Sequence, residues 1–211
     1  MMFSNKRGFE MSVGMIVIII ISVLIFSMSL YFVFKWFGSA EQLKAEIDRQ
    51  TQEQIIGALK TGNQLVAIPI AIQQAKRGTT TNFGIGIRNI AQEKPFSIAV
   101  SFSDAYKPDG AQIEYDRQYM NDHWLGGFAT TNIGNIKKNE QKVIPFLIKA
   151  DLNVAPNRPA TVGDYTFNVC VYDTMLDVNG QPQSPCDIGQ YQTNSQAFYT
   201  GKIYQVTVKI V

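Results

Sequence analysis

Residues 165–171 read Tyr-Thr-Phe-Asn-Val-Cys-Val, and this stretch decides the fold class. Large apolar side chains stand at every second position, which is the spacing at which the side chains of an extended strand share one face. Such a strand buries one face in a core and turns the other toward solvent or a covering loop. The stretch therefore predicts a strand in a half-buried sheet.

The same alternation recurs through residues 63–211, in three further sets and with a compact apolar strand at 142–148. The sets are Phe83, Ile85 and Ile87; Phe96, Ile98, Val100 and Phe102; and Tyr204, Val206, Val208 and Ile210. Leu65 to Ile72 is also apolar, and Pro69 inside it indicates an edge strand because proline has no N–H for a ladder. Turn sequences such as Lys107-Pro108-Asp109-Gly110 separate the strands. We therefore predict an all-β antiparallel sandwich of immunoglobulin-like type with about seven strands.

The start of the strand at 165 carries a second signal. Gly163-Asp164-Tyr165 resembles the corner tyrosine that precedes a late strand in immunoglobulin-like and fibronectin-like domains. A strand that simply begins with tyrosine is the alternative.

The N-terminal segment predicts a membrane helix. Residues 11–34 carry no charged side chain. At about 1.5 Å per residue, a helix of this length reaches roughly 36 Å and exceeds the roughly 30 Å hydrocarbon core of a bilayer. We expect a transmembrane helix over 11–37, a cytoplasmic leader over 1–10, and a single-pass protein of the cell membrane with an extracellular C-terminal domain. Signal-peptidase cleavage at Gly38-Ser39-Ala40 is an alternative.

A polar helix is expected between the apolar run and the strands. Leu43, Ile47, Ile55 and Leu59 are separated by multiples of four residues, which places them on one face of a helix. We assign 38–62 to a helical stalk and 63–211 to the β-sandwich domain. A short linker helix fits the same residues.

The leader Lys6-Arg7-Gly8, followed by a long apolar helix, resembles the class III signal sequence of type IV pilin-like proteins, particularly archaeal ones. The resemblance implies that a prepilin peptidase cuts between Gly8 and Phe9 and that the apolar helix forms a filament core. Many of these pilins carry glutamate at the fifth mature position, where this chain has Val13. An uncleaved signal anchor is the alternative.

These features favour a non-enzymatic surface protein. We expect a pilin-like structural or accessory subunit of a cell-surface filament, or alternatively an anchored immunoglobulin-like module for binding, adhesion or scaffolding. The expected partners are membrane lipid, the helices of other subunits in a homo- or hetero-oligomer, and a prepilin peptidase. The net charge is +2 with 17% charged residues, and no basic cluster indicates nucleic acid as a partner.

Two cysteines, Cys170 and Cys186, are candidates for a disulfide. Cys170 is out of phase with the apolar residues of its strand, so it should face away from the core or toward a covering loop. Cys186 lies in a loop that contains proline and glycine, and a bond would pin that loop to the outer face of the sheet. Free thiols are the alternative.

No arrangement of residues indicates a catalytic, cofactor or metal site. The single histidine, His123, cannot complete a copper site, which needs two histidines, and we expect it to be a structural loop residue. Asp104, Asp109, Glu114 and Asp116 lie close together in the sequence, but their spacing fits no EF-hand. A solvated loop is therefore preferred over a weak calcium site.

Overall fold

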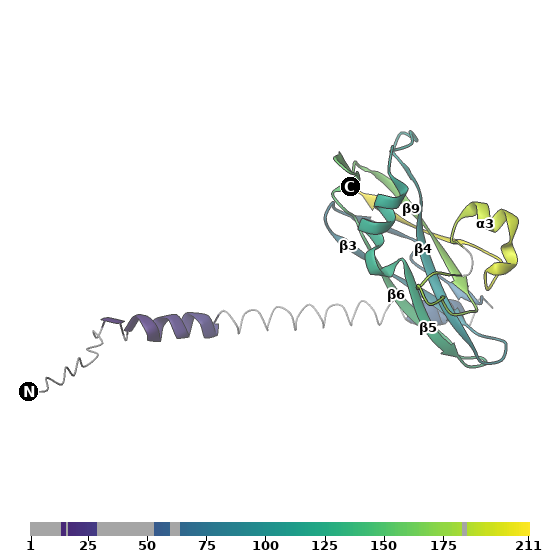
Figure 1. Cartoon of the computed structure of the whole chain (residues 1–211), viewed down its shortest axis with the longest axis horizontal. Helices are drawn as coiled ribbons and strands as arrows, with labels where there is room; N and C mark the ends of the chain where they lie inside the picture. The colour runs from purple at the N-terminus through teal and green to yellow at the C-terminus, as the bar shows by residue number, and fades with distance from the viewer. Residues whose placement is uncertain (1–13, 16, 29–52, 60–63, 183–184) are drawn as a thin grey trace, which may run out of the picture. The chain divides into compact units, whose positions relative to one another are not determined.

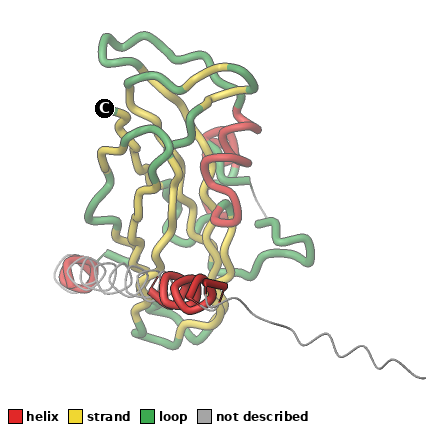
Figure 2. Tube along the Cα trace, turned by 90° about the vertical axis from the view of Figure 1, so that its left-hand side faces the viewer, coloured by secondary structure: helices red, strands yellow, loops and turns green. Residues whose placement is uncertain are grey.

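The computed structural model describes residues 14–15, 17–28, 53–59, 64–182 and 185–211. The chain divides into two compact units, Met1–Arg49 and Gln50–Val211. The described residues of the first unit are helical. In the second unit the strands form the body and short helices lie on its outside (Figures 1 and 2).

The strands of the second unit form two main sheets and a small ribbon. The larger sheet has the order β2 (Ile72–Ala75), β10 (Tyr204–Ile210), β9 (Gly163–Tyr172), β4 (Lys94–Tyr106) and β5 (Thr130–Ile136). The smaller sheet has the order β1 (Val66–Ala67), β3 (Thr80–Arg88) and β6 (Gln141–Lys149). The ribbon pairs β7 (Asn153–Ala155) with β8 (Arg158–Pro159).

The core of this unit consists of the side chains that alternate in the sequence. It includes Phe83, Ile85, Ile87, Phe96, Ile98, Val100, Phe102, Phe146, Ile148, Tyr165, Phe167, Val169, Val171, Val206, Val208 and Ile210. Phe102 on β4 lies opposite Phe167 on β9, and their rings meet edge to face at 5.3 Å between centroids. The strands predicted from alternation are therefore confirmed.

The predicted antiparallel immunoglobulin-like sandwich is wrong, because the larger sheet is mixed and the strands form a half-barrel. β2 runs parallel to β10, with Ile72 opposite Thr207. The single edge strand expected from Leu65 to Ile72 is divided between the two sheets, with Pro69 between β1 and β2. Proline cannot donate a ladder bond, so the chain leaves the smaller sheet there and joins the larger one in the parallel direction.

The predicted transmembrane helix is also contradicted. The described part of the apolar run is helical over 14–15 and 17–28. A membrane-spanning helix needs about 20 residues. Within the described parts of the chain, no helix is long and apolar enough to cross a membrane. The membrane localisation with a single pass, a cytoplasmic N-terminus and an extracellular domain, which depended on that helix, is contradicted with it.

Several sequence predictions fall on residues outside the described ones. These include the leader over 1–10, the candidate cleavage site at Gly8 and Phe9, and most of the stalk. Residues 53–59 of the stalk are described and are helical. Ile55 and Leu59 are fully buried against the smaller sheet with Ala67, as their four-residue spacing predicts.

Gly86 on β3 allows this helix to approach the sheet. A Cβ atom added at Gly86 would lie 2.9 Å from Cδ1 of Leu59 and closer still to Cγ2 of Ile55. Only glycine leaves room for both side chains at this distance. The glycine at this position therefore permits the close packing of the helix on β3.

Short helices follow β4 and β9. The first group is α2 (Arg117–Met120), the π-helix η1 (Asn121–Leu125) and η2 (Gly126–Phe128), and the second is α3 (Ile188–Thr193) with η3 (Ser195–Ala197). Asp116 begins α2 because its carboxylate accepts the backbone N–H of Tyr119 at 3.0 Å. The buried Trp124 of η1 donates its indole N–H to the carbonyl of Asn153 at 2.9 Å.

Candidate functional site

The loop that follows β9 covers the outer face of the larger sheet. A disulfide joins Cys170 of β9 to Cys186 of this loop, with their Cα atoms 5.7 Å apart. Cys170 is fully buried although it points away from the main core. It belongs to a second apolar cluster with Ala99, Tyr172, Cys186 and Phe198. β9 is therefore buried on both faces, and the loop supplies the cover on the outer one.

Tyr172 and Phe198 form the aromatic part of this second cluster. Their ring centroids are 5.6 Å apart. Burial, together with the nearby Asp187 carboxylate, raises the pKa of the Tyr172 hydroxyl. Removal from water disfavours the phenolate, so Tyr172 stays neutral and acts as a packing residue.

The loop is also fastened at its two ends. At the start, the Ser97 hydroxyl donates to the carbonyl of Thr174 at 2.8 Å, and the N–H of Leu176 donates to the side chain of Asn132 at 3.0 Å. At the end, the N–H of Tyr199 donates to the carbonyl of Val171 at 2.8 Å. The disulfide holds the middle of the loop, between these two attachments.

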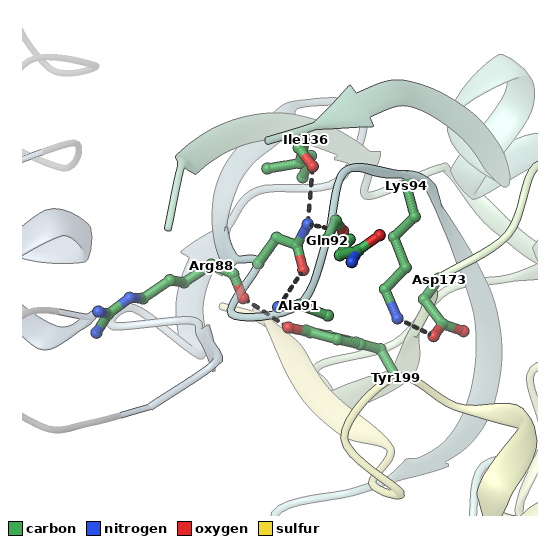
Figure 3. A network of polar contacts seen from close by, with 8 residues as sticks. Arg88, Ala91, Gln92, Lys94, Ile136, Asp173 and Tyr199 are labelled. Atoms are coloured by element: carbon green, nitrogen blue, oxygen red, sulfur yellow. Dashed lines mark hydrogen bonds and ion pairs between the residues drawn. The ribbon is translucent and has the colours of Figure 1, made fainter. Parts of the chain in front are cut away.

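A buried asparagine organises the polar network shown in Figure 3. Asn89 is 0% exposed, and its amide nitrogen donates to the carbonyls of Gln92 at 2.9 Å and Ile136 at 2.8 Å. Its amide oxygen accepts the N–H of Ala91 at 3.0 Å. The side chain holds the turn after β3 through these three hydrogen bonds. Its role is structural, because both N–H groups of the amide and its oxygen are bonded to the backbone around the turn.

Lys94 and Tyr199 join the two ends of the loop to this network (Figure 3). The Lys94 ammonium lies 2.5 Å from Asp173 and 5.4 Å from the centroid of the Tyr199 ring. The Tyr199 hydroxyl donates to the carbonyl of Arg88 at 2.7 Å. Burial raises the pKa of this hydroxyl. These contacts clamp the loop against β3 and β4.

The sequence did not identify this network, although a local signal was present. Asn89 stands directly after an alternating strand and is followed by polar residues. Asparagine there commonly bonds to the backbone two residues later, which is the contact made to Ala91. The contacts to Ile136 and Tyr199 come from distant parts of the chain, and no local pattern predicts them.

The acidic residues that the sequence singled out have separate partners. Asp104 accepts the Tyr115 hydroxyl at 2.8 Å, and Asp109 accepts the N–H of Ala111 at 3.0 Å. Glu114 forms an ion pair with Arg158 at 3.1 Å. Asp116 is the residue that caps the start of α2. Within the described residues, no group of three or more metal-ligating side chains comes together.

His123 lies in η1 rather than in a loop. Its ring stacks on Tyr119 with centroids 3.8 Å apart, and its Nδ1 lies 3.1 Å from the Tyr119 carbonyl oxygen. Both contacts are made within one helical segment. His123 therefore has a position consistent with a structural residue.

Comparisons with known proteins identify no family. No family model matches the chain, and no curated protein matches it. A family 123 glycoside hydrolase from Clostridium perfringens is 16% identical, with a TM-score of 0.33, over 66% of this chain and 22% of that chain. The DNA glycosylase AlkC from Pseudomonas fluorescens is 10% identical, with a TM-score of 0.36, over 70% of this chain and 30% of that one.

The sporulation control protein Spo0M from Bacillus subtilis gives a similar result. It is 11% identical, with a TM-score of 0.30, over 69% of this chain and 46% of that chain. This chain thus spans less than half the length of each of the three structures. TM-scores this low carry no argument about function.

Proposed function

We propose that this protein is a non-enzymatic structural subunit, pilin-like in that its N-terminal apolar helix packs against the helices of other copies in a filament. The observation that carries the proposal is the helix over 14–15 and 17–28. Its large apolar side chains are exposed on every side, from 47% at Val17 to 66% at Ile18 and Met28. A helix that is apolar all round is stable in water only when other apolar surface covers it.

The polar groups of this helix are already satisfied within it. The hydroxyls of Ser22 and Ser27 donate to the carbonyls of Ile18 and Val23, each at 2.8 Å. Burying the helix among copies would therefore leave these two hydroxyls paired. Fully burying an Ile or Leu side chain contributes roughly 1.5–3 kcal/mol. Several such side chains in each copy can offset the roughly 4–15 kcal/mol cost of association.

The non-enzymatic part of the proposal is supported by the polar groups of the second unit. Asn89 and Tyr199 hold the turn after β3, and His123 stacks within its own helix. The acidic side chains that the sequence singled out are divided among separate structural partners. This distribution favours a domain that assembles or binds over one that catalyses a reaction.

The test is self-association of the purified full chain in detergent-free buffer. Ile20→Arg places a charge in the middle of the exposed apolar helix and should reduce the assembled fraction at least tenfold by sedimentation and electron microscopy. Val178→Arg is the matched control, because Val178 is fully exposed in the loop after β9. A wild-type chain that stays monomeric, or an Ile20→Arg chain that assembles as well as the control, contradicts the proposal.

The cleavage implied by the leader has its own measurement. Mass spectrometry of the mature protein should find Phe9 at its N-terminus. An intact leader contradicts the prepilin-peptidase step, whereas the sedimentation result separately decides whether helices of different copies pack together.

A further inference from the structure

Polar side chains lie on the outer face of the larger sheet, beside the second apolar cluster that contains the disulfide. A pocket of about 370 Å³ opens there between β4, β9, α2 and the start of α3. Ser103, Asp104 and Asn168 line it from the sheet, Arg117 lines it from α2, and residues 187–189 line it from the loop. Its volume lies in the range of roughly 300–1,000 Å³ that small-molecule sites occupy.

Two buried residues of the sheet side have polar atoms that the protein does not use. Ser103 is 4% exposed, and no hydrogen bond within the described chain engages its hydroxyl. Asn168 is 1% exposed, and its amide oxygen accepts from the Gln205 amide at 3.1 Å. Its amide nitrogen has no acceptor among the described residues. Both residues line the pocket, so their hydroxyl and amide N–H groups are open to a molecule that enters it.

The position of Ser103 follows from an irregularity in the strand. The register of β4 against β9 shifts between Phe102 and Asp104, which leaves Ser103 as the extra residue. Arg117 of α2 supports this bulge by donating to the carbonyls of Phe102 at 2.9 Å and Ser103 at 3.0 Å. The guanidinium thus holds the backbone that presents the hydroxyl.

The kinds of polar atom in the pocket select among ligands. The Asn168 nitrogen donates, the Ser103 hydroxyl donates and accepts, and the carboxylates of Asp104 and Asp187 accept. The pocket is also lined by Arg117, whose two terminal nitrogens already donate to the carbonyls of Phe102 and Ser103, so an anion would face two carboxylates with this guanidinium engaged elsewhere. A cation offers donors only and would leave the Asn168 N–H facing a positive charge. Adjacent hydroxyl groups satisfy the whole set, because each hydroxyl both donates and accepts.

We infer that this pocket binds a neutral polyhydroxyl ligand, a sugar unit, through Ser103, Asn168 and Asp104. The disulfide fixes the opposite wall, since Asp187 and Ile188 come directly after Cys186. The Ser101 hydroxyl also donates to the carbonyl of Cys186 and holds the wall against β4. The site is independent of the proposed assembly through the N-terminal helix.

The first experiment titrates the isotope-labelled full chain with D-glucose, D-galactose, D-mannose and N-acetyl-D-glucosamine. The side-chain amide signal of Asn168 should shift in a saturable manner with at least one of these sugars. Methylguanidinium and inorganic phosphate are the comparison probes. Saturable binding of either comparison probe without binding of a sugar overturns the inference, as does an unchanged Asn168 signal in all four sugar titrations.

The second experiment removes the two unused groups. Ser103→Ala and Asn168→Asp should each weaken the binding of the best sugar at least tenfold. Asn168→Asp replaces the N–H donor but keeps an oxygen for Gln205. Thr207→Ala is the matched control, because it removes a hydroxyl from the same sheet face outside the pocket. Unchanged affinity in both pocket variants, or an equal loss in the control, overturns the inference. If a variant fails to fold, the shift of the wild-type Asn168 signal in the sugar titrations decides whether the pocket binds a sugar.

Discussion

The hydroxyl group of Tyr165 is bonded twice to the backbone of Thr161. It donates to the Thr161 carbonyl at 2.8 Å and accepts the Thr161 N–H at 3.0 Å. This bonding to a residue shortly upstream is the geometry of a tyrosine corner. The ring of Tyr165 is fully buried, with its centroid 4.7 Å from that of Trp124. One residue thus joins the turn before β9 to the core.

Removing this hydroxyl should destabilise the domain. Tyr165→Phe keeps the buried ring but leaves the N–H and carbonyl of Thr161 without their partner. We expect a loss of about 1–3 kcal/mol in the free energy of unfolding, measured by guanidinium titration. Tyr106→Phe is the control, because Tyr106 is 44% exposed. Equal stability of the two variants would show that the corner contributes nothing.

Breaking the disulfide should lower the stability of the folded domain, because the unfolded chain then gains conformational entropy. The bond between Cys170 and Cys186 closes a loop with a sequence separation of 16 residues. In the chain-entropy model, a loop of this size gives about 3 kcal/mol. The Cys170→Ala, Cys186→Ala double variant should show this loss in denaturant unfolding. A wild-type chain whose unfolding midpoint is the same with and without reductant would contradict the expectation.

Replacing Gly86 or Gly57 with alanine should change the stability of the domain in opposite directions. Gly86→Ala drives a methyl group into Ile55 and Leu59 and should cost about 1–3 kcal/mol through overpacking. Gly57→Ala, on the helix at 53–59, meets no atom within 4 Å and should stabilise by roughly 0.5–1 kcal/mol. Thermal unfolding of both variants makes the comparison. A stabilising Gly86→Ala would mean that the helix does not pack at this point.

Asp151 should make stability depend on acidic pH. Burial alone would raise the pKa of its carboxyl, but the hydrogen bonds from Lys149 at 2.6 Å and from the N–H of Asn153 at 3.2 Å outweigh it, so the pKa is lowered. A lowered folded-state pKa gives stability that is present above the unfolded value of 3.8 and lost as the pH falls through the folded value.

The measurement is the unfolding midpoint between pH 6 and pH 2 for the wild type and Asp151→Asn. The wild type should lose stability below about pH 4, and the variant should have a flatter profile because it has no carboxyl at this position to protonate. Identical slopes for the two proteins would exclude Asp151 as a source of the acid dependence.

The sequence predicted the strands that carry large apolar residues but not those that lack them. Phe96 to Phe102 and Tyr165 to Val171 alternate clearly and form neighbouring strands of one sheet. β5 was not predicted, because its sequence Thr-Thr-Asn-Ile-Gly-Asn-Ile is mostly polar, as suits an edge strand that pairs with β4 alone. His123 was expected to lie in a loop, whereas it lies in the helical segment η1, which packs through the buried Trp124.

The candidate sites also divide into one that the sequence could suggest and one that it could not. Cys170 and Cys186 could be proposed as partners from the phase of one strand and the composition of one loop. The pocket beside them could not, because Ser103 and Asn168 come from strands whose register shifts at a bulge. A bulge depends on how two distant strands meet, and it leaves no clear pattern in either strand alone.

The sequence by itself determined that the alternating apolar residues of β3, β4, β9 and β10 are buried, because side-chain alternation is a local property of an extended chain. It also placed Cys170 on the outer face of β9 and Tyr165 at the start of that strand. Only the tertiary structure decided that β2 runs parallel to β10, that Gly86 receives a helix, and that Ser103 and Asn168 share a pocket. These features depend on contacts between segments far apart in the chain, whose pairing is selected by the packing of the whole domain.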